Sequence, residues 1–157
     1  MDLMKKIPLT QGHFALIDNM DWELLSKYKW IAQKHSRSET LLYVTTVIKD
    51  KVIRMHRLVT RAKQGEIVDH INGDGLDNRR KNLRFCTFSQ NSANARLSKR
   101  NKTGFKGVCF MPKYQLYLAQ MAGEYLGLFK DPVEAAIAYN IKAKKKYGKF
   151  AYQNKIK

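Results

Sequence analysis

The stretch that decides the fold is Val68-Asp69-His70-Ile71-Asn72-Gly73, which continues through Asn82-Leu83-Arg84-Phe85 to Asn91. A short apolar run at 67–68 leads into the acid and the histidine, and a loop rich in Gly, Asn and Asp follows at 72–78. A second short run at 83–86 alternates between apolar and polar residues. Residues 87–90 have the Thr-x-x-Gln spacing of a capping box. The pattern predicts strand, loop, strand and helix, with Asp69 and His70 ending the first strand and Asn91 in the first turns of the helix.

These residue types suit the hydrolysis of a phosphodiester bond. An unperturbed imidazole titrates near ~6.5, so His70 can take a proton from water at neutral pH. The Asp69 carboxylate and the Asn91 amide are hard oxygen ligands, which suit magnesium or manganese. The alternative is a turn-rich hairpin whose Asp and Asn side chains only satisfy backbone groups. The fixed offsets of Asn82 and Asn91 from the acid favour the functional interpretation.

Asp69-His70, Asn82-Leu83-Arg84 and Asn91 together resemble the HNH nucleases, in the variant whose last motif position is Asn. Residues 55–59, Met-His-Arg-Leu-Val, are also similar to that family. The resemblance implies that His70 activates the water and that Asp69 and Asn91 hold one Mg²⁺ or Mn²⁺. It also implies that Asn82 is a catalytic-site residue that braces the hairpin. The expected protein is a metal-dependent DNA endonuclease of the homing or free-standing bacteriophage type, and therefore a hydrolase.

The adjacency of Asp69 and His70 sets a condition on the local structure. Neighbouring residues of a regular strand point to opposite faces, so both side chains cannot face one phosphate from a regular strand. Either the strand ends or bulges at this point, or Asp69 reaches the cation around the edge of the sheet. The sequence allows each of these arrangements.

The charge balance predicts a polyanionic partner. The 157 residues contain 30 Lys+Arg against 13 Asp+Glu, a net charge of +17, and double-stranded DNA is the expected polyanion. There is no long apolar run and no signal peptide, so we expect no membrane association and a cytoplasmic protein, in the host cytoplasm if phage-encoded. The two cysteines, Cys86 and Cys109, are too few for a four-cysteine zinc site and are expected to be reduced and semi-buried. No obligatory protein partner is inferred.

The first domain is predicted to span 1–97, with a β-rich platform and a ββα-metal core at about 56–97. We expect a strand pair within 7–17, a short helix at 22–27, a strand at 28–32, a polar loop at 35–39 and a hairpin of 41–48 with 51–55. Trp22 and Trp30 are interpreted as core residues, and Trp30 is expected to share a core with Tyr43, Val44, Val47 and Ile48.

A helix at 56–62 is expected to lead into the motif. His56 opens it, either as a second active-site histidine or, as we favour, as a hydrogen-bonded core histidine. Arg57 is a candidate phosphate contact, although a solvated charge is equally compatible with its position.

A basic run with hardly any acid follows the hairpin: Arg79, Arg80, Lys81, Arg84, Arg96, Lys99, Arg100, Lys102 and Lys106. Such a run is often only a solvated face. Beside a phosphate-cleaving site it favours counterion release on DNA, with Arg84 and Lys102 as candidate contacts. Residues 98–103 are interpreted as a basic linker that tracks the DNA backbone.

The C-terminal domain, 104–154, is predicted to be a small three-stranded antiparallel sheet packed on one helix, which completes an α+β protein. The strands are expected at 105–110, 116–122 and 124–129. The helix is expected at 132–147, with Asp131 as N-cap, Pro132 in the first position, Glu134 completing a capping box and Gly148 as the stop. Helical spacing places six residues along one side: Val133, Ala136, Ile137, Asn140, Ala143 and Tyr147.

Four segments of this domain, Gly-Phe-Lys-Gly-Val, Tyr-Leu-Ala-Gln-Met, Tyr-Leu-Gly-Leu-Phe and Glu-Ala-Ala-Ile-Ala-Tyr-Asn, resemble the ethylene-response-factor (Apetala-type) DNA-binding domain. The resemblance covers 103 to about 154 and implies that the exposed face of the sheet enters the major groove. It implies five DNA-binding positions, three on the sheet and two in the first turn: Lys106, Gln120, Tyr125, Lys113 and Tyr114.

The chain departs from that family at Cys109, Met111 and Ala122, where the plant domains usually have arginine. We therefore expect a grip on the DNA backbone that tethers the nuclease, rather than tight base reading. The alternative is a module that only packs on its neighbour. For the whole chain, the rival functions are a non-catalytic DNA-binding regulator and an RNA-directed basic protein, and few predicted stacking aromatics argue against the latter.

Overall fold

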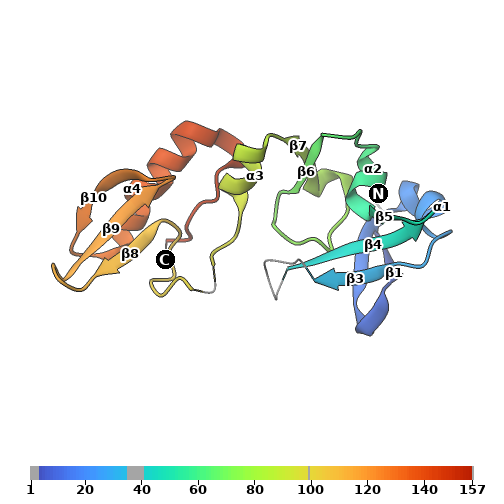
Figure 1. Ribbon diagram of the computed structural model, residues 1–157, viewed down its shortest axis with the longest axis horizontal. Helices are drawn as coiled ribbons and strands as arrows, with labels where there is room; N and C mark the ends of the chain where they lie inside the picture. The colour runs from blue at the N-terminus through green and yellow to red at the C-terminus, as the bar shows by residue number, and fades with distance from the viewer. Residues whose placement is uncertain (1–3, 35–40, 99, 157) are drawn as a thin grey trace. The chain divides into compact units, whose positions relative to one another are not determined.

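The chain forms two compact units, Met1–Thr87 and Phe88–Lys157, in the computed structural model, which describes residues 4–34, 41–98 and 100–156 (Figure 1). The mixture of helices and small antiparallel sheets agrees with the expected α+β class. The expected polar loop at 35–39 and Lys99 lie outside the described residues. Within the described ranges, none of the helices combines the length and hydrophobicity needed to span a bilayer.

The described residues of unit 1 form three small antiparallel sheets. Strands β1 (Met4–Pro8) and β2 (Phe14–Asp18) pair with each other, and β4 (Leu42–Ile48) lies between β3 (Ile31–Lys34) and β5 (Lys51–Arg54). Strands β6 (Ile67–His70) and β7 (Leu83–Cys86) form the hairpin of the motif. The helices are η1 (Thr10–Gly12), η2 (Asn19–Asp21), α1 (Trp22–Leu25), α2 (Met55–Thr60) and η3 (Arg80–Asn82).

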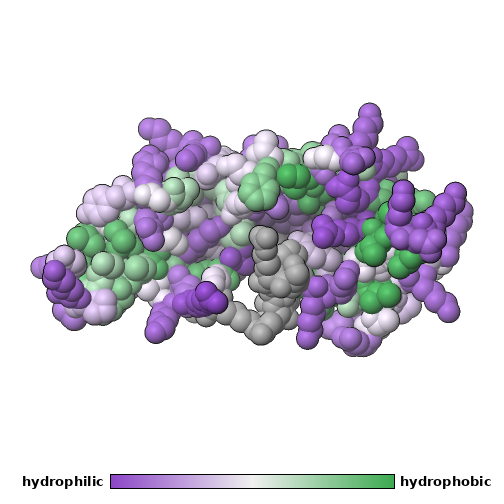
Figure 2. All heavy atoms as spheres, viewed as in Figure 1, coloured by the Kyte–Doolittle hydropathy of each residue, from purple (hydrophilic) through white to green (hydrophobic). Residues whose placement is uncertain are grey.

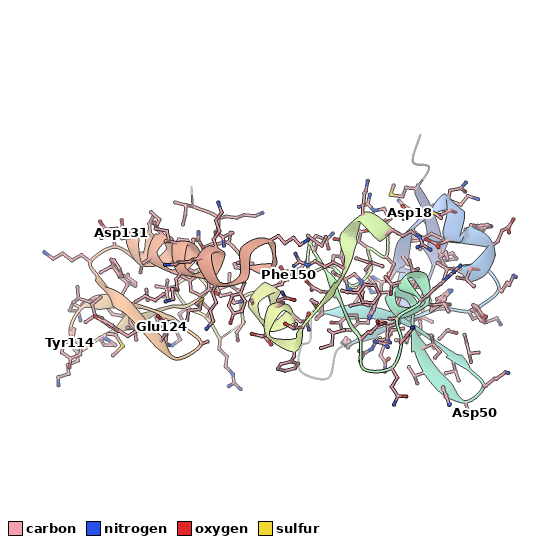
Figure 3. The ribbon with its side chains drawn as sticks, turned by 90° about the horizontal axis from the view of Figure 1, so that it is seen from above. Asp18, Asp50, Tyr114, Glu124, Asp131 and Phe150 are labelled. Atoms are coloured by element: carbon pink, nitrogen blue, oxygen red, sulfur yellow. The ribbon has the colours of Figure 1, made fainter. Side chains whose placement is uncertain are left out.

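The core of unit 1 joins the platform, which consists of strands β1 to β5, to the β6–β7 hairpin. It contains Trp30 and Val44 as expected, and Val68 and Leu83 from the two hairpin strands. The indole of Trp30 donates to the Leu25 carbonyl at 2.8 Å, so its one polar group is satisfied inside the core. The expectation for Val47 is wrong. This side chain is 60% exposed, because the end of the β4–β5 hairpin, whose turn carries the labelled Asp50, faces solvent (Figure 3).

Unit 2 has the predicted sheet and helix. Its elements are α3 (Phe88–Asn94), β8 (Val108–Met111), β9 (Leu116–Met121), β10 (Glu124–Phe129), α4 (Pro132–Tyr147) and η4 (Gly148–Phe150), with β9 in the centre of the sheet. The boundary between the units lies at 87/88 rather than 97, because α3 packs with α4 and η4. The first strand begins at Val108 instead of 105, because Asn101 and Thr103 bind the carbonyls of Phe105 and Val108 in a folded turn.

Helix α4 lies on one face of this sheet. Asp131 accepts the Val133 amide at 2.7 Å, which confirms the predicted N-cap. The side that helical spacing defines is buried only in part: Ala136 and Ala143 are buried, whereas Ile137 is 42% exposed. The buried side is instead Ala135, Ala136, Tyr139 and Ala143. Gly107 packs against this side: a Cβ there would lie 2.1 Å from the Tyr139 ring, so only glycine lets the chain approach Tyr139 this closely.

Candidate active site

Asp69 and Arg84 face each other across the β6–β7 hairpin, because the strand register pairs these two positions. Arg84 donates from Nε and Nη2 to Oδ2 of Asp69 at 2.9 and 2.7 Å. Only 8% of the acid side chain and 11% of the arginine side chain are exposed. The sequence predicts Arg84 as a DNA contact, whereas the structure places its guanidinium on the acid. This charge-assisted pair holds the carboxylate at the end of β6.

His70 is the last residue of β6 and is buried. The β6–β7 register runs through four pairs without a shift, so the strand ends at His70 and does not bulge there. Nε2 of His70 lies 3.4 Å from Oδ1 of Asn78. Burial lowers the pKa of His70, although Asn78 and the nearby acids Asp69, Asp74 and Asp77 act in the opposite direction. The imidazole is therefore neutral at neutral pH and can accept a proton.

His56, in the first turn of α2, is packed against His70. The two rings meet edge to face with 4.9 Å between centroids, and Tyr43 lies 5.7 Å from His56 and 6.0 Å from His70. Burial, followed by the charge of His70, lowers the pKa of His56 to about 3. Its burial agrees with the favoured core interpretation. The expected hydrogen bond is absent at Nδ1, which has no partner within the described part of the chain.

Asn82 braces the loop that connects the two strands. Its Oδ1 accepts the Asn72 amide, and its Nδ2 donates to Oδ1 of Asn72 and to the Asp77 carbonyl, all within 3.0 Å. Asn72 in turn donates to Asp77, which also pairs with Arg79 at 2.6 Å. Asn82 is buried, so its amide holds both ends of the loop. The resemblance to the HNH nucleases implies this bracing of the hairpin by Asn82.

Asn91 lies on α3, in unit 2, and is partly buried. Within unit 2, α3 is fixed by Lys106, whose ammonium donates to the carbonyls of Ser92, Ala93 and Ala95 at 3.3, 2.8 and 2.7 Å. Burial lowers the pKa of Lys106 to about 8. Lys106 precedes β8, so the expected position on the exposed sheet face is wrong. The described residues contain no cluster of three or more His, Cys, Asp or Glu side chains able to hold a metal ion.

The guanidinium of Arg57 also binds backbone carbonyls of the protein. Its guanidinium donates to the carbonyls of Glu66, Ala62 and Lys63, at 2.5, 3.4 and 2.7 Å, beyond the end of α2. These bonds satisfy carbonyls in the connection to β6. The structure thus gives Arg57 a local role, and its contact with a phosphate stays a prediction.

The other candidate DNA contacts of unit 2 are on its surface. Gln120 and Tyr125 are directly opposite each other in the β9–β10 register and both are exposed. Lys113 and Tyr114 lie in the β8–β9 turn, with the ammonium 5.3 Å from the ring centroid, and Tyr114 marks that end of the unit in Figure 3. Lys102 is exposed in the segment before β8.

The sheet face that carries Gln120 and Tyr125 is apolar, whereas a surface that binds the DNA backbone is usually rich in basic side chains. Val108 and Ala119 face α4, so Cys109, Leu118 and Leu128, which are in register, lie on the opposite face. Figure 2 shows hydrophobic surface over these strands. Cys109 is exposed, not semi-buried as predicted, whereas Cys86 is half-buried, and both are free thiols.

Sequence reasoning missed Asn78 and Tyr43 as neighbours of His70. Asn78 is completely buried, yet in the sequence it belongs to a loop whose Asn and Asp residues read as turn formers. Its backbone N–H donates to the carbonyl of Leu16 in β2, about sixty residues earlier in the chain, at 2.8 Å. The one local signal is the repeated Asx residues, which predict side-chain hydrogen bonds without naming partners.

Comparisons with known proteins identify a family for this segment and for the chain. The family model described as HNH endonuclease matches residues 54–93, the segment that holds His56, Asp69, His70 and Asn91. A protein of Acanthamoeba polyphaga mimivirus, described as an uncharacterized HNH endonuclease, is 30% identical over 152 residues, covering 93% of this chain and 77% of that protein. No solved structure matches the chain.

Proposed function

This chain belongs to the HNH endonuclease family, and from that premise we propose that it hydrolyses phosphodiester bonds of double-stranded DNA with His70 as the general base. The observation that carries the proposal is that a buried carboxylate, Asp69, and a buried imidazole, His70, occupy the last two positions of β6 in a braced hairpin. A hard anionic ligand and a proton acceptor are the two kinds of group that metal-assisted hydrolysis needs.

In the proposed reaction, Nδ1 or Nε2 of His70 takes a proton from a water molecule. The water oxygen then forms a bond to phosphorus, the bond from phosphorus to the deoxyribose oxygen breaks, and the departing oxygen takes a proton from solvent. Asn82 keeps the loop and the two strands in place during this step. Because burial keeps His70 neutral, the imidazole enters the reaction able to accept the proton.

We propose Asp69, in unit 1, as a residue that would hold a divalent cation, Mg²⁺ or Mn²⁺, and Asn91, in unit 2, stays the second ligand that the family resemblance implies. When bound, such an ion stabilises the negative charge that develops on the phosphoryl and leaving oxygens. Carboxylate and amide oxygens are hard ligands, so they fit a hard cation that keeps several of its waters better than a softer metal, which prefers sulfur or nitrogen ligands. Arg84 does not exclude this role. A carboxylate has about four lone-pair sites and can bind a guanidinium and a cation together.

The two units divide the proposed work of binding and cutting. With a net charge of +17, the chain is attracted to the DNA backbone over several ångströms. In unit 2, the exposed Lys102 and Lys113 are proposed backbone contacts, and Gln120 and Tyr125 are proposed contacts of the sheet face. This arrangement favours an endonuclease of the homing or free-standing type, which unit 2 tethers to its target.

A plasmid-nicking assay tests the proposal. The wild-type chain is expected to convert supercoiled plasmid to nicked or linear DNA in Mg²⁺ or Mn²⁺, and EDTA is expected to stop the reaction. His70→Ala should bind DNA with unchanged affinity and lose cleavage by ~10²-fold or more, which is the contribution of a general base. Cleavage by His70→Ala at the wild-type rate would overturn the assignment. Binding without cleavage by the wild-type chain would indicate a DNA-binding regulator instead.

A further inference from the structure

The side-chain amide of Asn78 has a fixed orientation. Its Nδ2 donates to the Gly75 carbonyl at 3.3 Å, and its Oδ1 lies 3.4 Å from Nε2 of His70. Turning the amide over would place its oxygen against the Gly75 carbonyl oxygen, so that two acceptors would face each other. Because Asn78 is completely buried, no solvent can compensate for that loss. The oxygen of Asn78 therefore faces His70.

The loop that carries Asn78 is anchored on two sides. The backbone N–H of Asn78 donates to the Leu16 carbonyl at 2.8 Å, and the backbone N–H of Leu16 donates to the Leu76 carbonyl at 2.9 Å. On the other side, a Cβ on Gly75 would lie 2.1 Å from the Leu42 carbonyl oxygen, so the loop packs directly on β4. Both anchors belong to strands of unit 1 outside the β6–β7 hairpin, and they add to the bond from Asn82 to the Asp77 carbonyl that holds the loop from the hairpin side.

The imidazole of His70 is held against this oxygen by two other rings. His56 meets it edge to face, with an angle of 88° between the rings, and Tyr43 lies 6.0 Å away with a tilt of 45°. Tyr43 comes from β4 and His56 from α2, and His56 is buried. Rotation of the His70 ring about its own axis is restricted by these contacts.

We propose that Asn78 is a positioning residue that fixes His70 in the tautomer protonated at Nε2, so that Nδ1 is the atom that takes the proton from water. An amide oxygen only accepts, so the facing nitrogen must donate, and the lone pair of the ring then lies on Nδ1. A neutral amide selects the tautomer without holding the ring as an imidazolium, which a carboxylate at this position would do. The inference rests on the proposed role of His70 as the general base.

The tautomer can be read directly in the wild-type chain. Nitrogen-15 NMR of histidine-labelled protein, with the His70 signals assigned from His70→Gln, distinguishes a protonated from an unprotonated ring nitrogen. We expect the proton of His70 on Nε2. A proton on Nδ1 would overturn the proposal, whatever the variants do. This measurement needs no DNA and no metal ion, so its result is separate from the success or failure of the nuclease assignment.

The kinetic test uses Asn78→Leu, which keeps the branched shape and the number of heavy atoms of the side chain and removes both hydrogen bonds. We expect a mixed population of His70 tautomers and a loss of kcat of roughly 10²-fold, within the range that a general base supplies, with KM within about threefold of wild type. Leu25→Ala, a core variant on α1, is the matched control for lost stability and should keep both the tautomer and kcat. Unchanged kcat and tautomer in a folded Asn78→Leu would contradict the proposal, and circular dichroism establishes the folded state.

Discussion

His56 and His70 lie edge to face, with 4.9 Å between ring centroids and 88° between the ring planes. One histidine lies in the first turn of α2 and the other ends β6, so this contact joins the helix to the hairpin strand within unit 1. Two imidazoles this close cannot both be charged without strong repulsion, and burial keeps both in the neutral form. The contact therefore connects the stability of unit 1 to pH.

The first prediction concerns the loss of stability in acid. In the folded chain the pKa of His56 is lowered to about 3, whereas in the unfolded chain it is near ~6.5. As the pH falls below that value, the unfolded chain binds a proton that the folded chain excludes. The free energy of unfolding should therefore decrease by about 1.4 kcal/mol per pH unit, for this one residue, until the folded chain is also protonated.

Urea unfolding between pH 7 and pH 4 measures this effect in wild type and in His56→Phe, which keeps an aromatic ring in the same place. The unfolding free energy of His56→Phe should fall less steeply with decreasing pH than that of wild type, by about 1.4 kcal/mol per pH unit. His70 is present in both chains and contributes equally to both slopes. Parallel curves would show that His56 does not titrate in this way.

The second prediction concerns the buried pair of Arg84 and Asp69. Arg84→Met leaves an acid that is 8% exposed without its guanidinium. Removing one partner of a buried pair costs about 3–5 kcal/mol, because the remaining charge is desolvated. We expect a decrease of that size in the unfolding free energy of unit 1, measured with urea.

The double variant Asp69→Leu with Arg84→Met provides the control for this pair, because it removes both charges. It should regain much of the lost stability, since apolar groups of similar size often replace a buried pair at little cost. If Arg84→Met changes stability by less than about 0.5 kcal/mol, the pair is no more than a surface-type ion pair.

The local elements of this chain could be predicted from its sequence, because the signals for them are local. The β4–β5 hairpin turns at Lys49 and Asp50, both with positive φ, as expected. Helix α4 begins after Asp131 and ends at Tyr147 as its capping residues indicate. The order of β6, β7 and α3 follows from the apolar runs and from the Thr-x-x-Gln signal.

The partners of charged side chains could not be predicted, because they depend on distant segments. Arg57, Arg84 and Lys106 all read as contacts for DNA, yet each binds protein oxygens in the fold. A basic residue has the same sequence signal whether its donors meet a phosphate or a buried carbonyl. For the same reason, Asn78 could not be distinguished from a turn former before its contact with Leu16 was known.

The third prediction tests the proposed metal ligands. Asp69→Asn and Asn91→Ala should each raise the Mg²⁺ concentration required for half-maximal nicking and lower the maximal rate, because each removes one oxygen ligand or its charge. Ser92→Ala is the control for Asn91, since Ser92 is the next residue on α3 and is exposed. A metal titration identical to wild type in Asn91→Ala would remove Asn91 from the set of ligands.

The fourth prediction separates two lysines that look alike in the sequence. Lys106 binds three carbonyls around the end of α3, whereas Lys113 is exposed in the β8–β9 turn. Lys106→Met should lower the unfolding free energy of the chain by about 1.5–3 kcal/mol, the range for hydrogen bonds to a charged group, and leave the salt dependence of DNA binding unchanged. Lys113→Met should do the reverse, with wild-type stability and a plot of log affinity against log salt that is less steep by about 1. Fluorescence anisotropy over a series of salt concentrations, combined with urea unfolding, measures both quantities. A shallower salt slope in Lys106→Met would mean that its ammonium leaves the carbonyls to bind DNA, which would restore the contact that the sequence suggests.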